Sequence, residues 1–569
     1  EKINEPADIR DYTAEQRRVL AEEMREALIK RTSLIGGHIG PNLGIIEATI
    51  ALHTVFDAPR DRIVFDVSHQ CYPHKMLTGR VGAYINEAEY HDVSGFTNTD
   101  ESAHDLFNIG HTSTGISLAA GLAKARNLAG GTENVVVVIG DGSMSGGEAL
   151  EGLNFIGEMG TNFIIVFNDN DQSISENHGG MYRKFKELRE TNGAAEDNLF
   201  RSLGLRYRYV ADGNDTEELI RVFSEEKDSD RPIVIHIHTV KGKGLPFAEN
   251  DPEGWHRHAP FHIESGIAKK ESTPDPYAVA TVDFVLETAK RNPNFVYLSA
   301  GIVGGINLSP EDRVALGSQY VDVGIAEEHA VAMASGLARA GARPIFGTYS
   351  TFFQRVYDQM SQDVAINRNP AVFLATGTSL YRSTDVTHLS FYDISIFSNI
   401  PNLVYLAPTS VEEHIAVLRW AVEQTEHPVM IRMPYSGYEE SPYPVRTDYS
   451  ELNRSIVVRE GRDVALIGVG NFAALASEAA DELAHEGLSV TVVNPLYLSG
   501  LDTALLDSLR ENHSLILTIE DGILAGGFGQ KVAAFYGDKK GVRVRNYGLP
   551  KKFFNRYDPH ALAREYHLT

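Results

Sequence analysis

Val135-Val-Val-Val-Ile-Gly140-Asp141-Gly142 is a continuous apolar run that ends in a Gly-Asp-Gly turn. A second apolar run, Phe163-Ile-Ile-Val-Phe167, leads into Asn168-Asp-Asn170. Short apolar runs bounded by turn residues are typical of strands that a parallel sheet buries on both faces. Open α/β sheets bind their ligands at the carboxyl ends of such strands. The two runs therefore predict an α/β fold with Asp141 and Asn170 at its binding edge.

The side chains at this predicted edge suit a metal-bound diphosphate. A carboxylate from Asp141 and an amide oxygen from Asn170 are ligands that hard divalent cations prefer. The glycine-rich turn lets the backbone approach an anion closely. Each motif alone has an ordinary explanation, because Gly-Asp-Gly is a common turn and Asn-Asp-Asn a common loop. Together they are typical of a thiamine-diphosphate site.

Length and composition indicate a large globular protein. The chain has 569 residues, of which 43% are hydrophobic and 23% charged, and this length suggests three or four domains. Its formal net charge of −25 disfavours binding to nucleic-acid backbones and to anionic membranes. We therefore expect neither nucleic acid nor a membrane among its partners.

The sequence also favours a cytoplasmic location. The single cysteine, Cys71, excludes an intrachain disulfide framework and a thiolate metal cluster, and it fits a reducing compartment. From Glu1 the chain runs into a charged amphipathic helix without the pattern of a secretory signal. No apolar run approaches the length of a membrane span.

Three series of alternating strands and helices predict three doubly wound α/β domains. Thr13-Ala-Glu-Gln16 reads as a capping box for a helix through about Lys30, before Gly36-Gly37-His38. We predict a first domain over 1–263. Its strands are expected at 62–67, 135–139, 163–167 and 232–240.

Two polar segments, 264–276 and 436–448, read as linkers that separate the other domains. The second domain is predicted over 277–435 and the third over 449–569. Strands of the second are expected near Val296 and at 344–347, 371–375, 403–406 and 429–433. Strands of the third are expected at 463–468, 489–493 and 514–519.

Motifs spread over the whole chain carry a family resemblance. They are Gly36-Gly-His-Ile-Gly-Pro-Asn-Leu-Gly44, Phe65-Asp-Val-Ser-His69-Gln-Cys-Tyr-Pro-His-Lys75, Gly110-His111-Thr-Ser-Thr-Gly-Ile-Ser117, Ser173-Ile-Ser-Glu-Asn177, Asp322-Val-Gly-Ile-Ala-Glu327-Glu-His329, Tyr349-Ser-Thr-Phe-Phe-Gln-Arg355 and Gly548-Leu-Pro550. With these motifs the chain resembles the 1-deoxy-D-xylulose-5-phosphate synthase family, which depends on thiamine diphosphate and is related to transketolase. The resemblance implies a homodimer. Each chain would have an N-terminal domain that binds the diphosphate, a central domain that binds the pyrimidine, and a C-terminal domain.

The resemblance implies thiamine diphosphate and Mg²⁺ as cofactors. Asp141, Asn170 and the backbone carbonyl of Gln172 match the metal ligands, and Gly142 and Ser143 belong to the cofactor-binding turn. The segment between Asn177 and Leu203 is shorter than is usual in the family, which we interpret as a trimmed loop near the site entrance.

Glu327 and Phe352 match the residues that bind the aminopyrimidine ring. A carboxylate hydrogen-bonded to a ring nitrogen shifts the ring's tautomer, so that the cofactor acts as its own base. Judged by position alone, Glu327 is also explained as an acidic residue in the first turn of a helix through Ala340. An isolated phenylalanine such as Phe352 is usually part of a core, so its assignment depends on its motif.

Four histidines, His38, His69, His111 and His256, match positions that face the cofactor and the reacting carbonyl. Imidazole donates to a developing alkoxide and exchanges protons near neutral pH. A single histidine is more often a surface or satisfied core residue, so these four are selected by their motifs. Lys241 is assigned to the cofactor in the same way, although a solvated charge in a turn also explains it.

The implied reaction joins two substrates, pyruvate and an aldehyde. Pyruvate loses carbon dioxide, and the remaining two-carbon unit is transferred to the aldehyde, which in the family is glyceraldehyde 3-phosphate. A phosphate is best bound by cationic partners such as arginine. Arg355, Tyr349 and His388 are retained for the acceptor.

The acceptor half departs from the family pattern. Aligning residues 374–388 places Gly377 at an expected phosphate-binding arginine and Thr384 at an aspartate that contacts the acceptor's hydroxyl groups. Tyr435 replaces another expected arginine. Arg382 and Asp385 lie close enough in sequence that a shifted loop would restore some contacts. We therefore hypothesise an acceptor preference that differs from that of the family.

Three alternative functions remain open at this point. Ketol transfer between sugar phosphates is suggested by the transketolase-like run Lys243-Gly-Leu-Pro-Phe-Ala-Glu-Asn250. A catalytically silent paralogue that only binds thiamine diphosphate is a second alternative, although a pure binder would not need Glu327. Nicotinamide binding by the third domain at Gly468-Val-Gly470 is weaker, because the full glycine fingerprint is absent.

Overall fold

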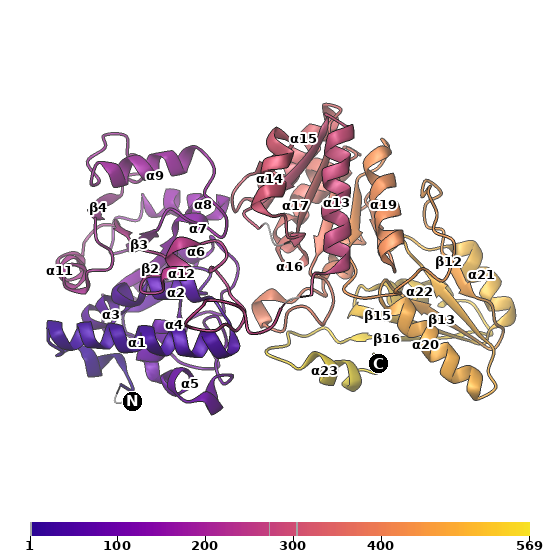
Figure 1. The fold of residues 1–569 in the computed structure, drawn as a ribbon, viewed down its shortest axis with the longest axis horizontal. Helices are drawn as coiled ribbons and strands as arrows, with labels where there is room; N and C mark the ends of the chain where they lie inside the picture. Colours follow the sequence, from indigo (N-terminus) through magenta and orange to yellow (C-terminus); the bar gives the residue numbers. More distant parts are fainter. Residues whose placement is uncertain (1–2, 272, 303–304) are drawn as a thin grey trace. The chain divides into compact units, whose positions relative to one another are not determined.

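Three β-sheets with helices between their strands form the chain (Figure 1). The computed structural model describes residues 3–271, 273–302 and 305–569. Contacts divide the chain into two units. The first contains the residues up to Thr273 together with Gly324–Ala326, and the second contains Pro274–Val323 together with Glu327–Thr569. The predicted α/β class is confirmed.

The first sheet is entirely parallel and has the strand order β1-β2-β3-β5-β4. The four predicted strands are present, and β4 is a fifth strand that was not predicted. That strand lies at the sheet edge and is mostly half-buried, so its polar residues hide the strand pattern. The strands are β1 (Arg62–Phe65), β2 (Val135–Gly140), β3 (Ile164–Asp169), β4 (Arg206–Val210) and β5 (Ile233–His238).

Strand β2 is continuously apolar because both of its faces are buried. Val135, Val137 and Ile139 belong to a core formed with helices α6 and α8. Val136 and Val138 pack on the opposite face with α3 and α11. The α-helices of this unit are α1 (Ala14–Ile35), α2 (Ile39–Gly44), α3 (Ile46–Val55), α4 (Tyr72–Lys75), α5 (Gly82–Ile85), α6 (Gly115–Ala129), α7 (Asp141–Met144), α8 (Gly147–Ile156), α9 (Gly180–Glu190), α10 (Leu199–Ser202), α11 (Thr216–Glu226) and α12 (Pro246–Asn250).

Helix α1 starts as predicted and ends later than predicted. The side chains of Thr13 and Gln16 form both hydrogen bonds of the capping box. The helix continues to Ile35, not Lys30, and stops at Gly36, whose φ is 75°. The predicted break at Gly36 is therefore confirmed, and the residues after Lys30 are helical, with buried Arg31 donating to the Tyr90 carbonyl oxygen at 2.7 Å.

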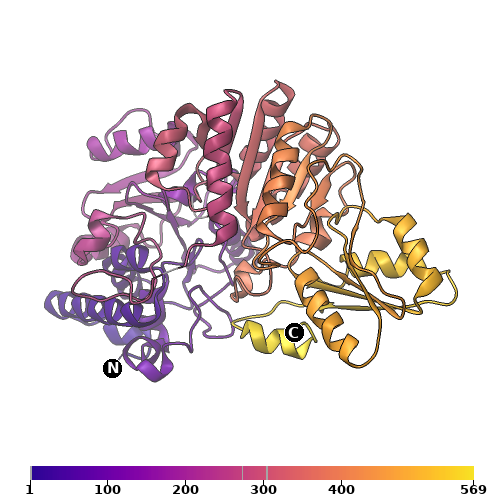
Figure 2. The same cartoon turned by 45° about the vertical axis from the view of Figure 1, so that its right-hand side comes forward.

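The second sheet is also parallel, with the order β10-β11-β9-β8-β6-β7. Helices α13 and α19 lie side by side on one face (Figures 1 and 2), and α15 packs on the other. The five predicted strands are present, and the short strand β7 was not predicted. The elements are α13 (Pro276–Arg291), β6 (Phe295–Ser299), α14 (Pro310–Leu316), β7 (Tyr320–Asp322), α15 (Glu327–Arg339), β8 (Arg343–Tyr349), α16 (Ser350–Phe353), α17 (Tyr357–Gln359), β9 (Val372–Thr376), α18 (Asp393–Phe397), β10 (Val404–Leu406), α19 (Val411–Glu423) and β11 (Val429–Arg432).

The third sheet is mixed, with the order β12-β14-β13-β15-β16. Only β12 is antiparallel to its neighbour. The two edge strands, β12 and β16, were not predicted. One hydrophobic cluster contains Phe346 and Phe373 of the second sheet together with Ile467 and Ile516 of the third. The elements are β12 (Ile456–Arg459), β13 (Val464–Gly468), α20 (Phe472–His485), β14 (Val490–Asn494), α21 (Thr503–Asn512), β15 (Leu515–Ile523), α22 (Phe528–Tyr536), β16 (Arg543–Leu549) and α23 (Pro559–Glu565).

The segment 436–448, predicted as a linker, is irregular. Its Tyr438 side chain contacts helix α20, which packs on the third sheet. The hydroxyl group of Tyr438 donates to the Ala473 carbonyl oxygen of α20 and contacts the Ser477 hydroxyl, both at 2.7 Å. Within the described ranges, the structure contains no helix that is both long and apolar enough to cross a membrane.

Candidate active site

The first sheet brings Asp141 and Asn170 to one edge. Strands β2 and β3 are paired neighbours, and Gly140 lies opposite Asn168 in their register. Asp141 begins α7 directly after β2, and Asn170 directly follows β3. Two residues that the sequence separates by a helix therefore follow the carboxyl ends of adjacent parallel strands, as the fold class predicts.

Asp141 is buried and accepts two hydrogen bonds on Oδ2. The backbone N–H of Gln172 donates at 3.0 Å, and the Asn177 side-chain amide donates at 2.7 Å. Burial, with the nearby charge of Asp169, raises the pKa of Asp141 to about 7. Asn177 is a site residue beyond those predicted, although it closes the Ser173-Ile-Ser-Glu-Asn177 motif.

Three buried oxygen atoms lie in the same loop region without a hydrogen-bonding partner among the described residues. They are Oδ1 of Asn170, Oδ1 of Asn177 and Oγ of Ser173. A buried polar atom without a partner costs about 1 to 3 kcal/mol. The described ranges hold no group of three or more His, Cys, Asp or Glu side chains suited to a metal. One carboxylate with amide and backbone oxygens is the donor set that Mg²⁺ accepts, so these residues fit the predicted cation.

Gly142 and Lys241 both meet Ser173. A Cβ atom at Gly142 would lie 2.8 Å from the Ser173 hydroxyl oxygen, so the turn requires glycine for its close approach. The Lys241 ammonium group donates to the Ser173 carbonyl oxygen at 2.6 Å. Burial lowers the pKa of Lys241 to about 8. The alternative of a solvated turn lysine does not describe this side chain, which is 5% exposed.

His38, His69 and His256 form a cluster in the first unit. Their ring centroids lie 5.3 Å apart for His38 and His69, 5.6 Å for His38 and His256, and 5.1 Å for His69 and His256. The amide of Asn42 ties two of the backbones together, donating to the His38 carbonyl oxygen at 2.6 Å and to that of His69 at 2.7 Å. Burial lowers the pKa of His256 well below its usual value, so its ring is neutral near pH 7.

His111 lies in the loop before α6, and Asp66 anchors that loop. The Asp66 carboxylate accepts from the backbone N–H groups of Ser113 at 3.0 Å and Gly115 at 2.7 Å. The Ser113 hydroxyl donates to the Ser143 carbonyl oxygen at 2.8 Å. The loop with His111 is thereby tied to the turn with Ser143.

In the second unit, Glu327 is the first residue of α15 and is 1% exposed. Burial raises its pKa, and the Arg355 guanidinium, 3.2 Å from Oε2, partly opposes that shift. A solvent-facing cap in the first helical turn would not be buried in this way. The environment suits a carboxyl group that holds or shares a proton with a partner.

Phe352 lies between two other predicted site residues of the second unit. Its ring centroid is 6.2 Å from that of Tyr349 and 5.8 Å from that of His388, which it meets edge to face. The Nδ1 atom of His388 is 2.8 Å from the Thr387 hydroxyl, which donates to Asp385 at 2.7 Å. Asp385 therefore holds the turn that carries His388.

The segment expected to bind the acceptor is built from aromatic rings. Gly377 follows β9 with a φ of 61°, and a Cβ atom there would lie 2.7 Å from the Tyr349 ring, so no side chain fits. Tyr435 stacks on Tyr381 with centroids 5.7 Å apart. The Arg382 guanidinium lies 4.8 Å from the Tyr435 ring centroid.

The neighbouring Arg382 side chain and the backbone at Thr384 also make internal contacts. Arg382 forms an ion pair with Asp275, which satisfies the charge that the shifted-loop hypothesis needed for a phosphate. The Thr384 carbonyl oxygen accepts from the backbone N–H of Arg556 at 2.7 Å. The Tyr557 hydroxyl donates to the carbonyl oxygens of Leu380 and Ser383.

Sequence comparisons assign the chain to a family. Residues 1–196 and 190–239 match the family described as 1-deoxy-D-xylulose-5-phosphate synthase. Residues 277–440 match the transketolase pyrimidine binding domain, and residues 454–569 match the transketolase C-terminal domain.

Curated relatives match over almost their entire lengths. The 1-deoxy-D-xylulose-5-phosphate synthase of Desulforudis audaxviator is 36% identical, with 100% of this chain and 95% of the relative covered. The enzyme of the same name from Halalkalibacterium halodurans is 35% identical, with 100% and 96% covered. Among solved structures, transketolase from Leishmania mexicana is 17% identical with a TM-score of 0.42, covering 98% of this chain and 96% of that one. The chain belongs to the 1-deoxy-D-xylulose-5-phosphate synthase family.

Proposed function

We propose that the protein is a thiamine-diphosphate-dependent decarboxylating synthase that joins a two-carbon unit from pyruvate to an aldehyde. The observation that carries this proposal is the set of buried oxygens near Asp141 and Asn170, which the cation that accompanies a diphosphate would satisfy. Membership of the family supports the reaction class. When bound, thiamine diphosphate would supply a carbon nucleophile for the keto group of pyruvate and a cationic ring that takes up the electrons released by loss of carbon dioxide.

The first unit would hold the metal and diphosphate end of the cofactor. Asp141, Asn170 and the carbonyl oxygen of Gln172 would bind Mg²⁺. Gly142 permits close backbone approach at the turn, and Lys241 brings an ammonium group to the same loop. The partly lowered pKa of Lys241 reflects burial, and a bound anion would favour its charged form.

The second unit would bind the aminopyrimidine. The buried carboxyl group of Glu327 would share a proton with a ring nitrogen, and its raised pKa favours that sharing. The aromatic ring of Phe352 would pack against the pyrimidine. Arg355 keeps the carboxyl group oriented through its contact with Oε2.

The histidines would act on the substrate oxygens. As a neutral ring, His256 has one N–H to donate to the keto oxygen of pyruvate as negative charge develops there. The His38 ring contacts the His256 ring. His69 and His111 would be further polar side chains that face the cofactor and the substrate. His388 and Arg355 are proposed for the aldehyde acceptor, for which glyceraldehyde 3-phosphate is the family reference.

A homodimer and a cytoplasmic location remain part of the proposal. The sequence supports both, the first through the family resemblance and the second through its single cysteine and its charge.

Carbon dioxide release from carboxyl-labelled pyruvate tests the proposed reaction. With thiamine diphosphate, Mg²⁺ and an aldehyde panel, we expect release that increases when an aldehyde is added, with a product mass equal to the aldehyde plus the two-carbon unit. Exchange between ketose and aldose phosphates without release from pyruvate would favour ketol transfer. A cofactor that binds but shows no change in circular dichroism with pyruvate, and no turnover with any donor, would favour the silent paralogue.

A further inference from the structure

Arg189 binds two carboxylates of the loop that carries Asn170. Its NH1 group donates to Oδ1 and Oδ2 of Asp169 at 2.8 and 2.6 Å. Its NH2 group lies 2.6 Å from Oδ1 of Asp171. Asp171 has a φ of 59°, and its backbone N–H donates to Asp169 at 3.0 Å. One guanidinium therefore fixes both residues that flank Asn170.

A second side chain, His236, also contacts Asp169. The Nε2 atom of His236 on β5 is 2.9 Å from Oδ2 of Asp169, and Nδ1 of His236 is 2.7 Å from the Tyr207 hydroxyl on β4. Asp169 and His236 are both fully buried. The side chains connect three adjacent strands, so Asp169 is anchored in the sheet, and Arg189 of helix α9 binds the same carboxylate.

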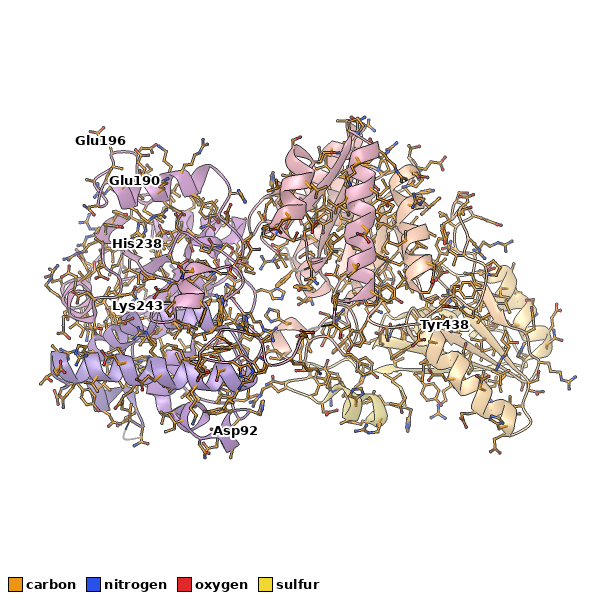
Figure 3. All side chains as sticks on the ribbon, in the orientation of Figure 1. Asp92, Glu190, Glu196, His238, Lys243 and Tyr438 are labelled. Atoms are coloured by element: carbon orange, nitrogen blue, oxygen red, sulfur yellow. The ribbon has the colours of Figure 1, made fainter. Side chains whose placement is uncertain are left out.

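Arg189 comes from the segment between Asn177 and Leu203, which the family resemblance led us to interpret as a trimmed loop. That segment forms helix α9, with Glu190 at its end (Figures 1 and 3). The helix buries Tyr182, Phe185 and Leu188, and the ring of Phe185 stacks on Phe200 with planes 2° apart. This packing fixes the position of helix α9 and therefore of the Arg189 backbone.

We propose that Arg189 is a positioning residue for the metal end of the cofactor site, and that it holds Asp169 and Asp171 so that the loop presents the Asn170 oxygen to the cation. This inference rests on the proposed function, because it needs Mg²⁺ and thiamine diphosphate to bind here. It gives the trimmed segment a structural role at the metal loop.

The variant Arg189→Gln tests whether Arg189 positions Asn170 or acts on Mg²⁺ only through its charge. Removing a positive charge beside a cation site reduces Coulomb repulsion, and this effect alone would strengthen cation binding. If Arg189 positions Asn170, the same change weakens binding, and loss of an outer partner of a ligand typically weakens it about 10 to 100-fold. The measurement is Mg²⁺-dependent thiamine-diphosphate binding by calorimetry, without substrate. Arg189→Lys keeps the charge and one contact, so we expect it to recover part of the loss.

Arg126→Gln provides the matched control. Arg126 lies in the same unit and donates to the carbonyl oxygens of Glu133 and Asn162, both at 2.9 Å, just before β2 and β3. It therefore holds the amino ends of the strands whose carboxyl ends form the site. We expect this variant to lower the thermal unfolding midpoint without changing the affinity for Mg²⁺ and cofactor.

The outcomes decide between the two roles. Weaker binding in Arg189→Gln, partial recovery in Arg189→Lys and unchanged binding in Arg126→Gln support positioning. Unchanged or tighter binding in Arg189→Gln, or an equal loss in Arg126→Gln, overturns it. If the wild-type chain binds cofactor and decarboxylates pyruvate while Arg189→Gln binds equally well, only this inference fails. If the wild-type chain binds no cofactor, the proposed function fails first.

Discussion

Replacing Tyr435 with arginine should increase the preference of the protein for a phosphorylated aldehyde. The family resemblance places arginines at the positions of Gly377 and Tyr435. A hydrogen bond to a charged group contributes about 1.5 to 3 kcal/mol, and 1.4 kcal/mol corresponds to about tenfold. The absence of two such contacts should lower the preference for phosphorylated acceptors by about 10² to 10⁴-fold relative to a synthase with both arginines.

Tyr435→Arg should restore only part of this preference. Tyr435 is 39% exposed, so water screens a cation there and the lower estimate of about tenfold applies. Gly377→Arg is the contrasting variant, because its Cβ would lie 2.7 Å from the Tyr349 ring at a φ of 61°. We expect that variant to lose stability without gaining phosphate binding.

The assay compares kcat/KM for glyceraldehyde 3-phosphate and glyceraldehyde at saturating pyruvate. The quantity of interest is the ratio of the two values, because it cancels changes in cofactor binding and in the amount of active enzyme. We expect a low ratio in the wild-type protein and a ratio about tenfold higher in Tyr435→Arg. A wild-type ratio equal to that of a synthase with both arginines would refute the reasoning.

Three further predictions concern single side chains. Glu327→Ala should leave folding and Mg²⁺ binding largely intact and remove most turnover, and near-normal carbon dioxide release would contradict its role. Asp141→Ala should weaken Mg²⁺-dependent cofactor binding by at least about tenfold, whereas unchanged affinity in calorimetry would exclude it as a ligand. Burial lowers the pKa of His414 from 6.5 to about 4, so its contribution to stability is complete above pH 6.5 and decreases as the pH falls towards 4, by up to about 3 kcal/mol. His414→Gln should therefore show a smaller loss of urea resistance between pH 7 and pH 4.5, and an equally steep loss would contradict this.

Local patterns predicted the features that depend on neighbouring residues. The apolar run at 135–139 marked a central strand because both faces of β2 are buried. Thr13 and Gln16 marked a helix start because a capping box involves only nearby residues. Edge strands such as β4 and β12 escaped prediction because half-buried residues lack a clear period.

The sequence by itself determined the α/β class, the central strands and the residues expected at the metal edge, since these follow from burial periodicity and from motifs. Only the tertiary structure decided which charged groups form ion pairs and where a side chain has no room. Arg189 pairs with Asp169, Arg382 pairs with Asp275, and the Tyr349 ring excludes a side chain at Gly377. These contacts join residues far apart in the chain, and no local pattern records them, because folding of the sheets and helices brings the partners together.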